Sequence, residues 1–406
     1  MIHTTELICQ LDHNTFNSLE EALIEPEIAK QVTKDGNNTV SYHNFPNYGI
    51  KITLKRYDSN KCNRPFYFVY LILNLAKLIG QNGSSISLYQ ICDFNEISDK
   101  FREAMTSITS GDIALQELCN IESYTTRRID FCCQYKVENP QLYIHLLNRG
   151  RFPSHGKYCN IGYENSCYIV GGKVEDGKII KHGSITINIY DKQAEMKAPK
   201  NHGKGYTAED LSEAENVLRV EIQAFRRKMI SLKDKYAYHD RCLKHYLNIS
   251  LAKELLLGYI KEIAGTADYY THRTLKNKVT KLSVHKETKE KMSKVLNELN
   301  GNAKNRPTLQ EYIGSQSDEE IGTLKRILKT MDSKEINSIA IPNKINGKNI
   351  NVSHLRSVYS LIENYFANKD STVPSDDRLD EKHLLEEVMT DDEVEEDFIE
   401  SMSTIK

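Results

Sequence analysis

The chain has 406 residues, of which 39% are hydrophobic, so it is long enough for two or three domains with cores of their own, and a single small module is excluded. The longest apolar run, residues 66–79, is interrupted by Asn74 and Lys77 and is too short to span a bilayer, so we expect a soluble cytoplasmic protein with no membrane partner. The nine cysteines are scattered and form no Cys-x-x-Cys pair, which indicates neither a zinc site nor a disulfide framework.

Charge is distributed unevenly along the chain. The formal net charge is −2, but from Asp376 onward thirteen acidic residues face three basic ones, so residues 1–375 carry 51 Lys and Arg against 43 Asp and Glu. Most of that basic excess lies within residues 226–306, which contain nineteen Lys and Arg and eight acidic residues. Such a patch is typical of a partner with a phosphate backbone, although solvated Lys-rich helices have the same composition.

The first segment, residues 1–118, mixes strand and helix patterns and is predicted to form an N-terminal α+β part. Alternating or continuous apolar residues indicate strands, and apolar residues at helical spacing indicate a helix. The predicted elements are strands at 39–42, 49–56 and 66–73 and an amphipathic helix at 95–109.

The second segment, residues 119–228, is dominated by strand patterns. We expect these strands to meet in a central antiparallel sheet, which makes the fold class α+β. The predicted elements are strands at 127–133, 158–161, 166–170, 184–190 and 218–225, a turn at 174–177 and a short helix at 210–216.

The third segment, residues 229–369, is predicted to be a basic helical region for DNA binding or other interactions. Residues 300–302 and Pro307 interrupt the helical pattern and suggest two helical units. The predicted helices lie at 249–264, 284–299, 319–331 and 352–367. Residues 370–406 are acidic with few apolar anchors and are predicted to be a disordered tail, whose simplest role is to increase solubility.

Three polar residues stand out on the predicted strands of the second segment. In 184–190, three isoleucines alternate with polar residues, so Tyr190 lies on the polar face, where we expect it to be accessible. Asp130 and Glu221 lie on polar faces of two other strands. A tyrosine nucleophile, a divalent cation and carboxylate ligands are what transesterification of a phosphodiester requires.

The same residues also fit a purely structural role. The chain has 23 tyrosines, and a tyrosine at a strand end is more often a packed ring with a hydrogen-bonded hydroxyl. Asp130 and Glu221 would then be ion-pair partners of neighbouring arginines, and Lys192 a solvated residue after a strand. Pattern alone leaves both interpretations open.

A series of short motifs favours the catalytic interpretation over the structural one. In order, they are Arg-Ile-Asp at 128–130, Gly-Arg-Phe at 150–152, Tyr-Ile-Val-Gly at 168–171, Asn-Ile-Tyr-Asp-Lys at 188–192 and Arg-Val-Glu-Ile at 219–222. The series resembles the Rep_trans family of rolling-circle replication initiators from small Gram-positive plasmids. The same domain occurs in relaxases of integrative conjugative elements, and filamentous-phage initiators share similar strand motifs. Asn188 stands where the family usually has Arg, so substrate positioning is expected to differ.

The resemblance implies roles for these residues. Tyr190 would be the nucleophile, which forms a 5′-phosphotyrosine and releases a 3′-hydroxyl that primes replication, with Lys192 and Glu221 as further catalytic residues. Asp130 and Glu221 would bind Mg²⁺ or Mn²⁺, since the chain lacks a His-hydrophobic-His pair and carboxylates favour these ions.

The resemblance also implies DNA partners. A single-stranded or hairpin origin would fit the site, and the basic helices would bind adjacent duplex, mainly through phosphates. Further candidate partners are a host helicase and a second copy of the chain, which would form a homodimer. The predicted DNA-binding residues are Arg128, Arg219, Arg226, Arg227, Lys228, Arg273, Lys276 and Lys278, with residues 270–278 as the first candidate for reading bases. Two alternatives stay open: a relaxase that nicks a transfer origin, and a non-catalytic DNA-binding repressor.

Overall fold

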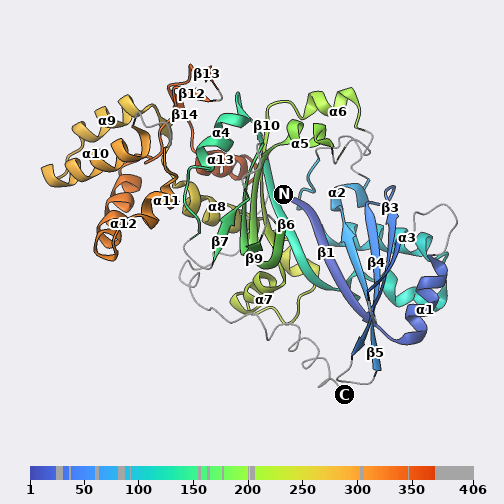
Figure 1. Ribbon diagram of the computed structural model, residues 1–406. Coiled ribbons are helices and arrows are strands. Elements are labelled where there is room, and N and C mark those ends of the chain that lie inside the picture. The colour runs from blue at the N-terminus through green and yellow to red at the C-terminus, as the bar shows by residue number, and fades with distance from the viewer. Residues whose placement is uncertain are drawn as a thin grey trace. The chain divides into compact units, whose positions relative to one another are not determined.

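Figure 1 shows the computed structural model of the chain. The structure describes residues 1–23, 31–35, 38–59, 64–80, 87–91, 93–153, 157–161, 165–175, 178–199, 201, 206–301, 306–345 and 347–370. Contacts group residues 1–371 into one compact unit. Of the predicted acidic tail, residues 370–406, Asp370 ends the last described helix, and residues 371–406 lie outside the described residues. No helix in the described ranges has the length and apolar character needed to cross a membrane.

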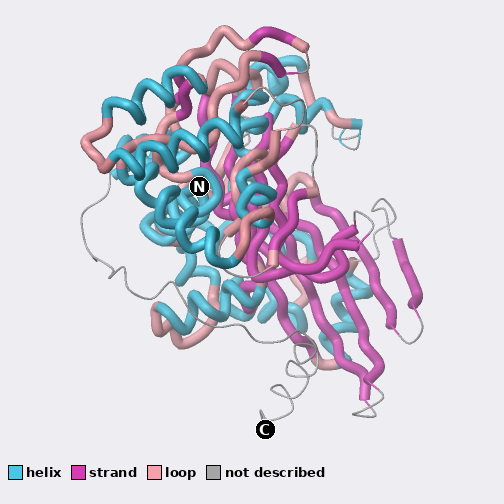
Figure 2. Tube along the Cα trace, turned by 60° about the vertical axis from the view of Figure 1, so that its left-hand side comes forward, coloured by secondary structure: helices cyan, strands magenta, loops and turns pink. Residues whose placement is uncertain are grey.

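A ten-stranded antiparallel sheet organises the described chain, and Figure 2 shows its strands side by side. Its order is β2-β3-β4-β5-β1-β6-β10-β9-β8-β7. The strands are β1 (Ile2–Leu11), β2 (Gln31–Asp35), β3 (Asn38–Phe45), β4 (Ile50–Ser59), β5 (Arg64–Leu73), β6 (Thr125–Lys136), β7 (Tyr158–Asn160), β8 (Ser166–Glu175), β9 (Lys178–Asp191) and β10 (Val217–Ala224). The predicted α+β class with a central antiparallel sheet is confirmed.

The first strand, β1, was not predicted, yet it joins the two halves of the sheet. It pairs with β5 on one side and with β6 on the other. Its register against β6 shifts between Ile2 and Thr5 and again between Glu6 and Leu7. The first shift adds a residue to β1 and the second adds one to β6, so the alternation by which a strand is recognised in sequence is broken in β1 near Ile2.

Helices account for most of the remaining described residues. They are α1 (His13–Ala22), α2 (Leu75–Leu78), α3 (Phe94–Ile108), α4 (Pro140–Leu147), α5 (Lys192–Lys197), α6 (Ala208–Glu213), α7 (Arg226–Lys235), α8 (Ile249–Ala264), α9 (His272–Lys281), α10 (Lys286–Asn300), α11 (Leu309–Gly314), α12 (Asp318–Ser333) and α13 (Val358–Asp370). Helix α8 matches its predicted range because its ends are marked in the sequence: Asn248 caps its N-terminus, and Gly265 adopts a φ of 73° after its last turn.

The main core lies on one face of the sheet. Alternate residues of β6, β9 and β10, among them Phe131, Ile187 and Val220, are buried there with residues of α7, α8 and α13. Burial of these apolar faces supplies the main favourable term for folding of this part.

A second core joins α9, α10, α11 and α12 with Leu142 and Leu146 of α4. The helical region therefore divides between two cores: α7, α8 and α13 pack on the sheet, and the helices between residues 272 and 333 pack on one another. This division differs from the one predicted from the interruption near residues 300–307, because α13 returns to the sheet after the second core is complete.

Replacement of Ile187 by Ala tests the sheet core. Ile187 is fully buried on the central strand β9, so the variant should lower the free energy of unfolding by about 2–5 kcal/mol in urea denaturation. Ile113→Ala is the matched control, since Ile113 is 84% exposed and its loss should change the free energy by less than about 0.5 kcal/mol. Equal effects of the two changes would contradict this core assignment.

Candidate active site

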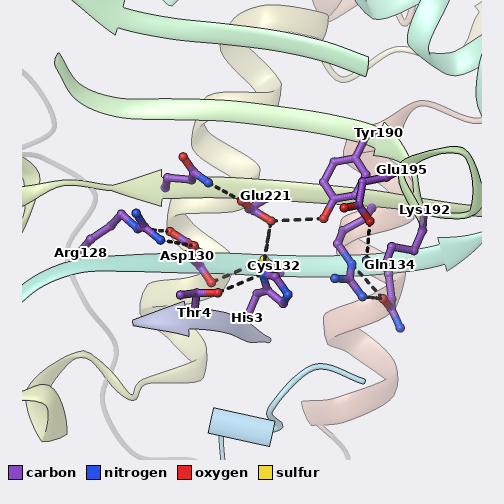
Figure 3. A network of polar contacts seen from close by, with 12 residues as sticks. His3, Thr4, Arg128, Asp130, Cys132, Gln134, Tyr190, Lys192, Glu195 and Glu221 are labelled. Atoms are coloured by element: carbon purple, nitrogen blue, oxygen red, sulfur yellow. Dashed lines mark hydrogen bonds and ion pairs between the residues drawn. The ribbon is translucent and has the colours of Figure 1, made fainter. Parts of the chain in front are cut away.

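The register of three strands brings the predicted site residues together on the face opposite the main core. Arg219 of β10 lies opposite Tyr190 of β9, while Glu221 lies opposite Asn188 and, on the other side, opposite Cys132 of β6. Tyr190 and Asp130 are therefore both diagonal neighbours of Glu221, within reach of side-chain contact. We call this set of polar side chains on β6, β9 and β10 the polar face, and Figure 3 shows it from close by.

Tyr190 contacts Glu221 but is not accessible, contrary to the sequence-based expectation. Its hydroxyl donates a long hydrogen bond, 3.5 Å, to Glu221 Oε2, and the residue is only 6% exposed. Helix α5 contacts β9 and β10, and Figure 3 shows Glu195 of that helix beside the Tyr190 ring. Burial raises the pKa of the Tyr190 phenol well above its usual value, while the nearby Arg219 guanidinium acts in the opposite direction.

Glu221 is the residue through which most of the polar face is connected. Its Oε1 accepts a hydrogen bond of 2.6 Å from the Gln223 amide, and its Oε2 lies 3.6 Å from the Cys132 sulfur. Its Oε2 also lies 3.8 Å from Nδ1 of His3, whose side chain is 31% exposed. His3 was missed in the sequence because its strand, β1, was missed. Its partial exposure gives the buried carboxylate a neighbour that solvent can reach.

Asp130 is buried and paired with an arginine. Arg128 lies with its Nε 3.0 Å from Oδ1 of Asp130 and donates a hydrogen bond of 3.2 Å from Nη2 to Oδ2, and Arg128 also lies 3.6 Å from Glu6. Burial raises the pKa of Asp130, Arg128 opposes this shift, and the charge of Glu221 adds to it. Two neighbouring buried carboxylates, Asp130 and Glu221, form an oxygen donor set of the kind that suits Mg²⁺ or Mn²⁺.

Arg219 and Lys192 are placed differently from the sequence-based expectation. Arg219, predicted to contact DNA, is fully buried and donates hydrogen bonds of 2.6 and 3.2 Å to the side chain of Gln134. Lys192, expected near a phosphate, is 4% exposed and forms an ion pair of 2.7 Å with Glu195. Both residues are buried because helix α5 and the side chain of Gln134 cover this end of the sheet. The alternation of polar and apolar residues along a strand does not reveal such cover.

The other predicted DNA-binding residues lie on two helices. Arg226, Arg227 and Lys228 of α7 are half-buried, and burial lowers the pKa of Lys228. On α9, Arg273 and Lys276 are exposed, while Lys278 is half-buried with its Nζ 3.9 Å from the centre of the Tyr270 ring. Of the eight predicted residues, Arg273 and Lys276 are the exposed ones.

Aromatic and basic side chains continue the polar face across β1 to β5. Glu6 pairs in register with Arg128, and Ile8, two residues on, lies opposite Tyr70 of β5, so Tyr70 shares this face. Nζ of Lys55 lies 4.7 Å from the centre of the Tyr70 ring, and Cζ of Arg127 lies 5.2 Å from it. Bases of single-stranded nucleic acids stack on such rings beside positive charges. We call Lys55, Tyr70 and Arg127 the Tyr70 cluster.

Comparisons with known proteins connect this chain with replication. The family model Phage_CRI, which describes the N-terminal part of a replication-associated protein, matches residues 1–250. A solved structure described as a rolling circle replication initiator protein from Geobacillus stearothermophilus is 12% identical and matches over 65% of this chain and 84% of its own, with a TM-score of 0.30. None of the curated proteins matches the chain.

Replacement of Arg128 by Met tests the buried ion pair of the polar face. Burial raises the pKa of Asp130 to about 8, so the test is made at pH 9, where the carboxylate is ionised. There the variant leaves a buried charge without its partner, so the free energy of unfolding should fall by about 3 kcal/mol, and a second change, Asp130→Asn, should restore part of the loss. Arg102→Met is the control, because Arg102 and Asp99 form an exposed pair worth at most about 1 kcal/mol. If Arg128→Met is no more harmful than this control in urea denaturation, the buried pair does not have the electrostatic role described.

Proposed function

The chain belongs to the Phage_CRI family of replication-associated proteins, and on this premise we propose that it is a rolling-circle replication initiator that nicks one strand of its origin with Tyr190 as the nucleophile. The contact that carries this proposal is the one between the Tyr190 hydroxyl and the Glu221 carboxylate, on a polar face within the matched residues. Among the tyrosines that the motifs singled out, Tyr190 combines a hydroxyl directed at a carboxylate with an arginine on the opposite strand.

The proposed reaction is a transesterification. The Tyr190 oxygen bonds to the scissile phosphorus and gives its proton to Glu221, and the bond from phosphorus to the 3′-oxygen breaks. The DNA 5′-phosphate stays on the tyrosine, and the 3′-oxygen takes up a proton and becomes the primer end. Because one phosphodiester replaces another, the reverse reaction can rejoin the strand after a round of synthesis.

Arg219 is proposed to assist the nucleophile rather than to bind DNA directly. It is buried on β10 opposite Tyr190, where its fixed positive charge favours the phenolate over the phenol. Since the Tyr190 ring is covered, the scissile phosphate reaches it only when α5 side chains such as Glu195 move aside. In this proposal the ion pair between Lys192 and Glu195 opens at that step, and Lys192 then becomes available to the phosphate.

The polar face also suits a divalent cation. Asp130 and Glu221 would hold Mg²⁺ or Mn²⁺ through their carboxylate oxygens. When bound, the ion would neutralise negative charge on the scissile phosphate. Arg128 engages both oxygens of Asp130 and would have to release one of them to the ion.

Single-stranded origin DNA is the proposed substrate, and adjacent duplex the proposed ligand of the helices. The Tyr70 cluster shares the sheet face with the proposed site and offers a ring and two cations to a single strand. Exposed Arg273 and Lys276 on α9 offer charges to duplex phosphates. A host helicase and a second copy of the chain stay predictions.

Two alternative functions make different predictions. A relaxase would use the same residues on a transfer origin, so only the DNA sequence it recognises separates it from a replication initiator. A non-catalytic DNA-binding protein is favoured by one observation, the burial of Tyr190. It would bind origin DNA without forming a covalent adduct.

Replacement of Tyr190 by Phe tests the nucleophile. Wild-type protein incubated with single-stranded origin oligonucleotides and Mg²⁺ or Mn²⁺ should form a protein–DNA adduct that survives a denaturing gel, and Tyr190→Phe should form none. Tyr168→Phe is the matched control, because Tyr168 lies on the neighbouring strand β8 opposite Asn188, on the same face. An adduct from Tyr190→Phe, or its loss only in Tyr168→Phe, would contradict the assignment.

The path of the single strand is tested by Tyr70→Leu. In a Tyr190→Phe background, which separates binding from cleavage, this change should weaken binding of a fluorescent single-stranded oligonucleotide by about 1–3 kcal/mol, the usual contribution of one stacked base. Tyr48→Leu serves as the control, since Tyr48 lies outside this face and its hydroxyl contacts Ser107. Equal affinity of the Tyr70 and Tyr48 variants would exclude the Tyr70 cluster from the path.

A further inference from the structure

Two histidines and an aspartate meet after α7, in the segment that leads to the 3₁₀ turn η4 (Leu243–Tyr246). Nε2 of His239 lies 2.8 Å from Oδ2 of Asp240, and Nε2 of His245 lies 3.0 Å from Oδ1. One ligand atom from each of the three residues lies within 4.8 Å of the others. None of these residues belongs to the polar face or to the Tyr70 cluster.

The segment that carries these residues is held in place on both sides. The ring of His245 stacks on Tyr238, with centres 4.8 Å apart and planes inclined by 14°. The backbone N–H of Cys242 donates a hydrogen bond of 2.8 Å to Oδ1 of Asp240, which fixes the carboxylate. Thr126 N–H at the start of β6 donates to the Arg241 carbonyl at 2.8 Å, so the segment is tied to the sheet.

We infer that His239, Asp240 and His245 form a binding site for a divalent transition metal ion, with Zn²⁺ as the best fit. Two imidazole nitrogens and one carboxylate oxygen are ligands that Zn²⁺ takes at about 2.0–2.2 Å, and water would complete its coordination. Two such ligands on a tetrahedral ion lie about 3.3 Å apart, so the donors must separate by only a few tenths of an ångström. The exposed side chains of His239 and Asp240, 71% and 48% accessible, can make that adjustment.

The site differs in chemistry from the proposed carboxylate site on the polar face. Mg²⁺ prefers oxygen ligands and binds imidazole poorly, whereas two histidines favour Zn²⁺, Co²⁺ or Ni²⁺. A metal here would lie outside the reaction and would fasten the link between α7 and α8 to the sheet. Its expected effect is therefore on stability, with no direct part in nicking.

The experiment measures Zn²⁺ binding by calorimetry to the full-length protein in the presence of excess Mg²⁺, which occupies oxygen-rich sites. Wild type should bind one tight equivalent of Zn²⁺, and His239→Gln and Asp240→Asn should each weaken it by at least about tenfold. His285→Gln is the matched control, since His285 is an exposed histidine on another element and its loss should leave the affinity unchanged. Co²⁺ in place of Zn²⁺ should give a visible absorption band that the two site variants lose.

Thermal unfolding gives an independent readout. Zn²⁺ should raise the melting temperature of wild type and of His285→Gln, and leave that of His239→Gln unchanged, because an ion that binds only the folded state stabilises it. His239 is largely exposed, so its variant should fold, which circular dichroism verifies. Zn²⁺ affinity that is the same in wild type and both site variants, or is lost equally in His285→Gln, would overturn the inference.

Discussion

The antiparallel register of β6, β10 and β9 is the constraint on which the proposed site depends. Because side chains alternate between the two faces of a strand, the same register that buries Ile187 and Val220 in the main core places Tyr190, Glu221 and Asp130 together on the other face. A shift of one residue between β9 and β10 would move Tyr190 into the core and away from Glu221. The packing that stabilises the sheet thus also determines the geometry of the proposed site.

Burial gives the polar face its electrostatic character. Asp130 and Glu221 lie almost out of water, and the positive charges near them belong to Arg128 and Arg219. In such surroundings an unpaired charge costs free energy, and the electrostatic interaction of a charge with a bound substrate is strong because the local dielectric constant is low. In the proposed function, the covered Tyr190 would stay protonated until DNA is present, because burial disfavours the phenolate.

Local patterns were enough to predict much of this arrangement. The alternation of residues 184–190 and 218–225 predicts strands whose polar faces carry Tyr190 and Glu221, and both strands are present as β9 and β10. Strand β1 could not be predicted in the same way, because a register shift between Ile2 and Thr5 interrupts its alternation, and His3, which lies within that shift, was missed with it. The burial of Tyr190 and Arg219 could not be predicted from the sequence either. It comes from the packing of α5 and from the side chain of Gln134 on the neighbouring strand β6.

The most direct test of the account is to identify the residue joined to DNA. Wild-type protein would be trapped with a single-stranded origin oligonucleotide and Mg²⁺ or Mn²⁺, digested with a protease and a nuclease, and analysed by mass spectrometry for a peptide with a nucleotide attached. The account predicts a single modified peptide with the 5′-phosphate of the DNA on the Tyr190 oxygen. A nucleotide on another tyrosine, or on no residue although DNA is cleaved, would contradict it.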